Sequence, residues 1–177
     1  MDQLLDRVAK FHSLLAEAGV PYRLVGGMAV FLHVSARDRM SARLTRDIDA
    51  AIDRDQLPRV IAAAERAGWK YRHAAGIDML VDAENPSARS AVHLVFLREK
   101  VRPEYVEEVP ASEPERRRDG FFVASVADLV RMKLTSYRLK DRVHIQDLDG
   151  VGLITPEIEA GLPQLLRERL AEVRASE

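Results

Sequence analysis

Residues 24–52 read LVGGMAVFLHVSARDRMSARLTRDIDAAI, and this stretch decides the fold. An apolar strand ends at Gly26 and Gly27, and an apolar helical run follows at once. Glycine has no Cβ, so the backbone of such a turn can approach a phosphate closely, and a helix N-terminus favours negative charge. The stretch therefore predicts a strand, a phosphate-binding turn and a helix. The alternative is that the two glycines simply end a strand.

Two acids follow in a run, 44–52, that is typical of a second strand. Asp47 and Asp49 are two residues apart, and alternate side chains of a strand point to the same face. Two neighbouring carboxylates repel each other unless a cation lies between them, and Mg²⁺ prefers carboxylate and phosphate oxygens. A phosphate-binding turn followed by a Mg²⁺ site indicates phosphoryl or nucleotidyl chemistry. The alternative is that both acids lie on the exposed face of an edge strand.

The glycine pair and the motif RLTRDID at 43–49 together resemble the nucleotidyltransferase superfamily of DNA polymerase beta type. The likeness is strongest to a small bacterial branch that contains AbiEii-like toxins, aminoglycoside and lincosamide nucleotidyltransferases, and minimal antitoxin nucleotidyltransferases. It extends to 123–148 and so touches most of the chain. It implies an α/β fold, with a mixed β-sheet flanked by helices and a C-terminal helical segment.

The resemblance also implies roles for individual residues. Asp47 and Asp49 would hold two Mg²⁺ ions, one on the triphosphate of a nucleoside triphosphate (NTP) and one lowering the pKa of an attacking hydroxyl. The nucleotide-binding residues would be Gly26, Gly27, Thr45, Arg46 and Lys133. Lys133 lies on or beside the apolar stripe of a predicted helix, 125–139, where a surface lysine is unusual. We expect it to reach the phosphates or to pair with an active-site carboxylate.

The family usually supplies a third carboxylate from a later strand, and here that position holds His93. Imidazole is a poor ligand for Mg²⁺ and suits Mn²⁺ better. His93 could act as a general base, since its ordinary pKa is about 6.5. Asp78 could supply the missing charge if strands 77–81 and 91–97 form a hairpin centred near Pro86, because it would then lie roughly opposite His93. The site could also bind nucleotide without turnover, or the two residues could form a purely structural pair.

The remaining helical segment offers weaker signals. Asp141 is expected to cap the helix predicted at 140–151 and to orient basic neighbours. His144 and Asp147 are three residues apart, a spacing that could hold a metal, but one such pair is weak evidence and we assign both to the surface.

The chain has 177 residues, enough for one compact domain with an α/β core at 1–124 and a helical segment at 125–177. The remaining predicted helices are 3–18, 28–34, 55–67, a short one from 155 and 163–173, and the remaining predicted strands are 22–25, 69–73 and 121–124. Residues 99–120 are rich in proline and charge, and predict a long surface excursion.

Composition restricts the partners. The net charge of −1 argues against broad nucleic-acid binding, which needs a large basic surface. No apolar run approaches the roughly 20 residues that span a bilayer, and the first residues predict an amphipathic helix instead of a signal peptide. The sequence contains no cysteine, so a cytoplasmic location is expected.

Two functions follow as hypotheses. The first is an enzyme that moves a nucleoside monophosphate from Mg·NTP to a hydroxyl of an acceptor, either a small molecule or a protein side chain, with RNA least favoured. The second is a catalytically impaired relative that acts as an antitoxin-like or regulatory protein-binding partner.

Overall fold

The computed structural model describes residues 2–84, 86–87, 91–117 and 119–176. Its helices are α1 (Asp2–Glu17), α2 (Gly26–Arg37), α3 (Leu57–Arg66), α4 (Val126–Ser136), α5 (Leu139–Gly150), α6 (Pro156–Ala160) and α7 (Gln164–Ala175), with a 3₁₀ turn η1 (Arg54–Gln56). Its strands are β1 (Arg23–Val25), β2 (Ile48–Ile52), β3 (Trp69–Ala74), β4 (Ile77–Asp82), β5 (Val92–Phe96), β6 (Glu115–Arg116) and β7 (Phe122–Val123).

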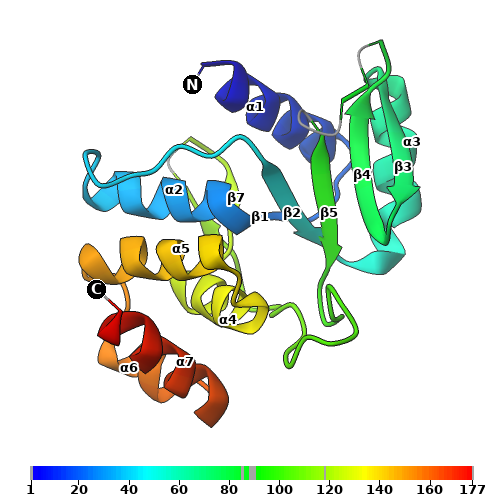
Figure 1. The fold of residues 1–177 in the computed structure, drawn as a ribbon. Helices are drawn as coiled ribbons and strands as arrows, with labels where there is room; N and C mark the ends of the chain where they lie inside the picture. The colour runs from blue at the N-terminus through cyan, green and yellow to red at the C-terminus, as the bar shows by residue number, and fades with distance from the viewer. Residues whose placement is uncertain (1, 85, 88–90, 118, 177) are drawn as a thin grey trace.

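The strands form one mixed sheet in the order β3-β4-β5-β2-β1-β7-β6 (Figure 1). β2 pairs antiparallel with β1 and parallel with β5, while β1 pairs parallel with β7. The strand that carries Asp49 is therefore central, and the alternative of an exposed edge strand is wrong. The fold is the mixed α/β arrangement with C-terminal helices that the sequence predicts.

One face of the sheet is covered by α1 and α3. The alternate residues Ile48, Ala50 and Ile52 of β2 are fully buried on this face. Phe11 of α1 stacks on Trp69 of β3, with 6.3 Å between the ring centroids. Burial of this apolar surface is the main stabilising contribution to the core. Asp49 points to the other face, because neighbouring residues of a strand alternate.

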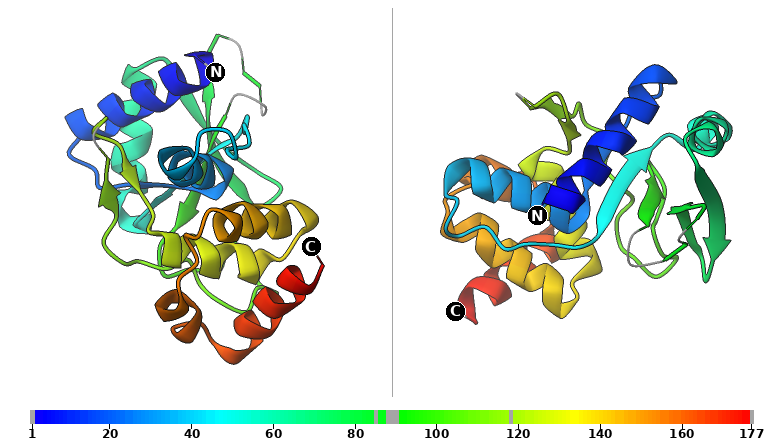
Figure 2. Two further views of the ribbon diagram at one scale, coloured as in Figure 1. Left: turned by 90° about the vertical axis from the view of Figure 1, so that its left-hand side faces the viewer. Right: turned by 90° about the horizontal axis from the view of Figure 1, so that it is seen from above.

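The C-terminal helices pack against α2 and against one another. α5 contacts α2, and α4 contacts both α2 and α7 (Figure 1). The views in Figure 2 show α6 and α7 at the end of the molecule opposite α3. Helix caps follow the sequence: the Ser125 hydroxyl accepts a hydrogen bond from the Asp128 amide, and Thr155 caps α6 before Pro156. This packing brings α5 next to the Gly26–Gly27 turn.

Three local predictions are wrong. β2 begins at Ile48, so Asp47 lies in the irregular segment just before the strand. A short strand, β6, occurs within the predicted excursion at 99–120 and pairs with β7. In the β4–β5 pair Met79, and not Asp78, is opposite His93. Part of the turn predicted between these two strands lies outside the described residues.

Candidate nucleotide site

The first element of the site is the turn that joins β1 to α2. Gly26 has a φ of +66°, a conformation that other residues rarely adopt. A Cβ on Gly26 would lie 2.0 Å from Oδ2 of Asp49, and a Cβ on Gly27 would lie 3.0 Å from Oγ1 of Thr45. The space that these two side chains would fill is therefore used by polar groups of the 45–49 segment. Glycine has a steric cause at both positions and, at Gly26, a conformational cause as well.

The second element is a group of two acids and a histidine. Asp49 lies between Val25 of β1 and His93 of β5, and Nδ1 of His93 is 3.3 Å from Oδ1 of Asp49. This contact raises the pKa of His93 above its usual value, against the opposing effect of partial burial. The charge of Asp47 also raises this pKa, so both carboxylates lie within electrostatic reach of the ring.

The side chains of the site favour a metal ion that is coordinated by a bound ligand as well as by the protein. Among the described residues, no three His, Asp or Glu side chains are grouped so that they could hold a metal ion by themselves. Asp47 and Asp49 offer carboxylate oxygens beside a turn that lacks Cβ atoms. Mg²⁺ is commonly bound by one or two carboxylates together with phosphate oxygens and water, and these residues fit that pattern. His93 adds a nitrogen, which suits Mn²⁺ better than Mg²⁺.

Asp78 lies on the opposite face of the sheet from Asp49. It accepts hydrogen bonds from the hydroxyl of Tyr71 and from Nδ1 of His73 at 3.0 Å, and its side chain is almost completely buried. A shift of one residue in strand register exchanges the two faces, which explains the difference from the prediction. The predicted pair between His93 and Asp78 is wrong, and the carboxylate that contacts His93 is that of Asp49.

Thr45 and Arg46 lie in the segment that leads into β2. The Thr45 hydroxyl is beside Gly27 and accepts a long hydrogen bond, 3.4 Å, from the Asp47 amide. The side chain of Arg46 is exposed, and its carbonyl oxygen accepts a hydrogen bond from Arg7. Thr45 thus lies against the glycine turn, whereas Arg46 connects the segment to α1.

Lys133 is buried in α4 and pairs with a carboxylate outside the two-aspartate group. Its ammonium is 2.9 Å from Oδ1 of Asp141, which is fully buried. Asp141 also accepts hydrogen bonds from Ser136 and from the amide and guanidinium of Arg138. Burial alone would raise the pKa of Asp141, but these donors together with Lys133 hold it well below its usual range. The prediction that Asp141 caps α5 and orients basic neighbours is confirmed.

Two residues of α5 that the sequence prediction did not assign to the site also lie here. Cε1 of His144 is 3.3 Å from the place of a Cβ on Gly27, and Nδ1 of the same ring is buried with no hydrogen-bond partner among the described residues. Burial, followed by the charge of Lys133, lowers the pKa of His144 to about 4. The charge of Lys140 lowers the pKa of both His144 and His93. His144 is partly buried and not on the surface as predicted, and its position in the sequence gave no signal of this.

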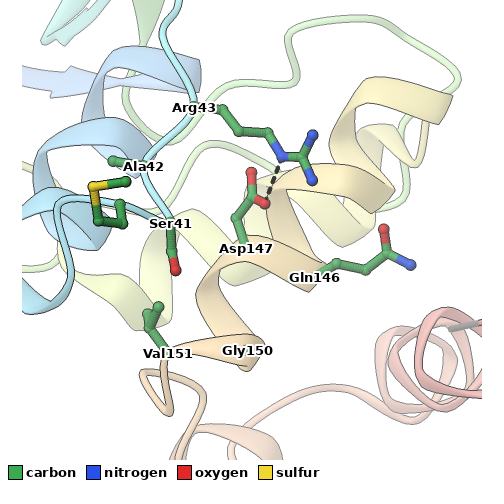
Figure 3. Close-up of a pocket in the computed structure, with 8 residues that line it drawn as sticks. Ser41, Ala42, Arg43, Gln146, Asp147, Gly150 and Val151 are labelled. Carbon is green, nitrogen blue, oxygen red and sulfur yellow. Dashed lines mark hydrogen bonds and ion pairs between the residues drawn. The ribbon is translucent and has the colours of Figure 1, made fainter.

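An open pocket of about 420 Å³ adjoins this region (Figure 3). Residues 40–43 form one side, and Gln146, Asp147 and Val151 contribute to the other. Figure 3 shows Arg43 reaching across to Asp147, with 2.8 Å between Nε and Oδ1. This ion pair connects the segment before β2 to α5, three residues beyond His144. In the part of the chain that is described, no helix is both long enough and apolar enough to span a bilayer.

Comparison with known proteins supports the fold at low sequence identity. No protein-family model matches the chain, and no curated protein does. The chain resembles the solution structure of the antibiotic-resistance factor ANT(2'')-Ia with a TM-score of 0.53 and 15% identity, over 99% of this chain and 85% of the other. For ANT(2'')-Ia in complex with adenylyl-2''-tobramycin the TM-score is 0.47 at 13% identity, over 99% and 97% of the two chains. For the Megavirus polyadenylate synthase it is 0.44 at 9% identity, over 99% and 35%. The chain thus shares its mixed α/β fold with the solution structure of ANT(2'')-Ia.

Proposed function

We propose that this protein is a nucleotidyltransferase that moves a nucleoside monophosphate from Mg·NTP to a hydroxyl of a small-molecule or protein acceptor. The observation that carries the proposal is the contact between the Gly26 turn and the carboxylate of Asp49. It joins a phosphate-binding backbone at the end of β1 to a metal-binding side chain on the neighbouring strand β2. Together with the 43–49 motif, it favours the small bacterial branch of AbiEii-like toxins and antibiotic nucleotidyltransferases.

Each residue has a stated task in this proposal. The backbone amides at Gly26 and Gly27 would bind phosphate oxygens, since they begin a helix, whose N-terminus favours an anion. Asp47 and Asp49 would hold Mg²⁺, which would supply charge neutralisation at the phosphates and activation of the hydroxyl. His93, which Asp49 orients through Nδ1, can accept the hydroxyl proton at its other ring nitrogen.

Thr45 and Lys133 hold neighbouring segments of the site in position. Thr45 lies against Gly27 and fixes the segment that carries Asp47. Lys133 binds Asp141 and thereby fixes the start of α5 beside α4. Direct contact of Lys133 or Arg46 with the nucleotide stays a prediction.

A labelled-NTP transfer assay tests the proposal. Each of the four α-labelled NTPs is incubated with cell extract and with the wild-type protein or the Asp47→Ala, Asp49→Ala double variant. We expect the wild type to label an acceptor and the double variant to lose at least about a hundredfold in rate, because removal of the metal ligands removes transition-state charge stabilisation. Asp55→Ala, at an exposed acid of η1, is the matched control. Equal labelling by wild type and double variant would refute the proposal.

The second candidate is a protein that binds Mg·NTP, or a protein partner, without transfer. The observation that favours it is the imidazole of His93 at the place where the family usually has a carboxylate. Calorimetry of Mg·NTP binding, run beside the transfer assay, separates the two candidates. Binding without transfer to any acceptor would support this antitoxin-like or regulatory function.

The variant His93→Asp tests whether His93 contributes to the metal site. If His93 contributes to the metal site, a carboxylate at position 93 should move the metal preference from Mn²⁺ towards Mg²⁺, because a nitrogen ligand is replaced by oxygen. The ratio of the transfer rate in Mn²⁺ to the transfer rate in Mg²⁺ measures this preference. An unchanged ratio would assign His93 to proton transfer or to positioning of Asp49.

A further inference from the structure

We propose that one face of α5, formed by Lys140 and His144, binds the triphosphate across from the Gly26–Gly27 turn. This inference rests on the proposed function and adds two contact residues to its site. Residues four apart on a helix are neighbours on one face, so the two side chains lie one turn apart. Because α5 packs on α2, this face is directed towards the start of α2.

The position of His144 is the first argument. Cε1 of its ring approaches the place of a Cβ on Gly27 to 3.3 Å, so the edge of the imidazole lies at the turn itself. Nδ1 is buried and makes no hydrogen bond within the described part of the chain. A buried polar atom without a partner costs free energy, and in native structures it commonly marks a place for a ligand or water. A phosphate oxygen at the turn would accept the single N–H of the neutral ring.

The position of Lys140 is the second argument. Lys140 lies one helical turn before His144 on α5, so it is on the same face as the ring that approaches the glycine turn. Within the described residues, no carboxylate is within ion-pair distance of Lys140, and its side chain is exposed. It is therefore available to a ligand.

The other basic residues of the segment are already engaged. Asp141 holds the ammonium of Lys133 and the guanidinium of Arg138 in one buried network. A triphosphate beside Asp47 and Asp49 needs positive charge in addition to the metal, since like charges repel. Lys140 can provide it without breaking the Asp141 network, in which the carboxylate of Asp141 already caps the start of α5.

The test is a binding series by calorimetry with Mg·NTP. Lys140→Gln removes the charge and keeps most of the side-chain length, and His144→Leu removes the ring nitrogens. We expect each variant to bind Mg·NTP at least about tenfold more weakly, the effect of one hydrogen bond to a charged group. The loss should diminish for the nucleoside monophosphate and disappear for the nucleoside. Lys70→Gln, at an exposed lysine of the edge strand β3, should bind as wild type.

Two further variants identify the atom of His144 that makes the contact. The amide of His144→Asn is near the place of Nδ1, and that of His144→Gln is near the place of Nε2. If Nδ1 makes the contact, His144→Asn should retain most of the affinity for Mg·NTP. If Nε2 makes it, His144→Gln should do so. Thermal unfolding by circular dichroism confirms that each variant is folded.

Different failures have different meanings. If the wild type binds Mg·NTP and both Lys140→Gln and His144→Leu bind equally well, this inference is wrong and the proposed function survives. An equal loss of affinity for nucleoside and triphosphate would also overturn it, because the contact would then be to the base or sugar. Absence of Mg·NTP binding by the wild type would remove both proposals.

Discussion

Substitution of Gly26 by alanine tests the contact on which the site depends. A residue other than glycine in the left-handed conformation costs about 1–2 kcal/mol. The new Cβ would also lie 2.0 Å from Oδ2 of Asp49, so that side chain must leave its position. An off-rotamer side chain costs a further 0.5–1.5 kcal/mol, roughly. We expect Gly26→Ala to lower the free energy of unfolding by about 1.5–3.5 kcal/mol, summed from these two effects.

The chain offers a matched control at the end of α3. Gly68 has a φ of +79°, and a Cβ on it would meet nothing within 4 Å. Gly68→Ala therefore has the same backbone strain without the steric conflict. Both substitutions reduce the entropy of the unfolded chain equally, so that effect cancels in the comparison. The difference between the two variants measures what displacement of Asp49 costs.

Urea unfolding and Mg·NTP calorimetry together give the result. Gly68→Ala should lose about 1–2 kcal/mol of stability and bind Mg·NTP as wild type. Gly26→Ala should lose more stability and bind no nucleotide, because the displaced carboxylate no longer faces the metal position. The reasoning is refuted if Gly26→Ala is no less stable than Gly68→Ala, or if it binds Mg·NTP with wild-type affinity.

Two other predictions concern stability. Asp141→Asn should destabilise the protein by about 3–5 kcal/mol in urea unfolding, since it leaves the ammonium of Lys133 buried without its counter-charge; a loss under 1 kcal/mol, roughly, would contradict this. The second prediction concerns pH. The folded pKa of His144, about 4, lies below its ordinary value of 6.5, so between these values the unfolded chain binds more protons. Stability due to neutral His144 is complete above pH 6.5 and is lost as the pH falls towards 4. The unfolding free energy of His144→Gln should depend less steeply on pH in this window, and parallel curves for the two proteins would contradict the assignment.

Sequence patterns were sufficient to predict the features that depend on residues close together in the chain. Gly26 and Gly27, Asp49 and the cap at Ser125 depend on backbone conformation and short spacing, and each lies where the pattern puts it. The start of β2 depends on strand pairing instead. Leu44 and Thr45 have the composition of a strand, but Leu44 is largely exposed and the pairing with β1 and β5 begins only at residues 48 and 49.

Tertiary packing decided the features that sequence reasoning missed. The register of β4 on β5 is set by which side chains the core can bury, and a difference of one residue moves Asp78 to the other face. His144 is polar, so periodicity gave no reason to bury it. Its place follows from the packing of α5 on α2, which is a contact between distant parts of the chain.

The order of the sheet has a consequence for biosynthesis. β1, which leads into the glycine turn, is paired on one side with β2 and on the other with β7, where Leu24 lies opposite Val123. α5 follows later still. A ribosome that adds about 5–20 residues per second exposes the turn early and the strand and helix that enclose it late. A nascent chain, or one truncated before Leu139, has both aspartates and no α5 beside them. Any contact that α5 makes with a nucleotide thus becomes available only after residues 139–150 have been made, well after both aspartates.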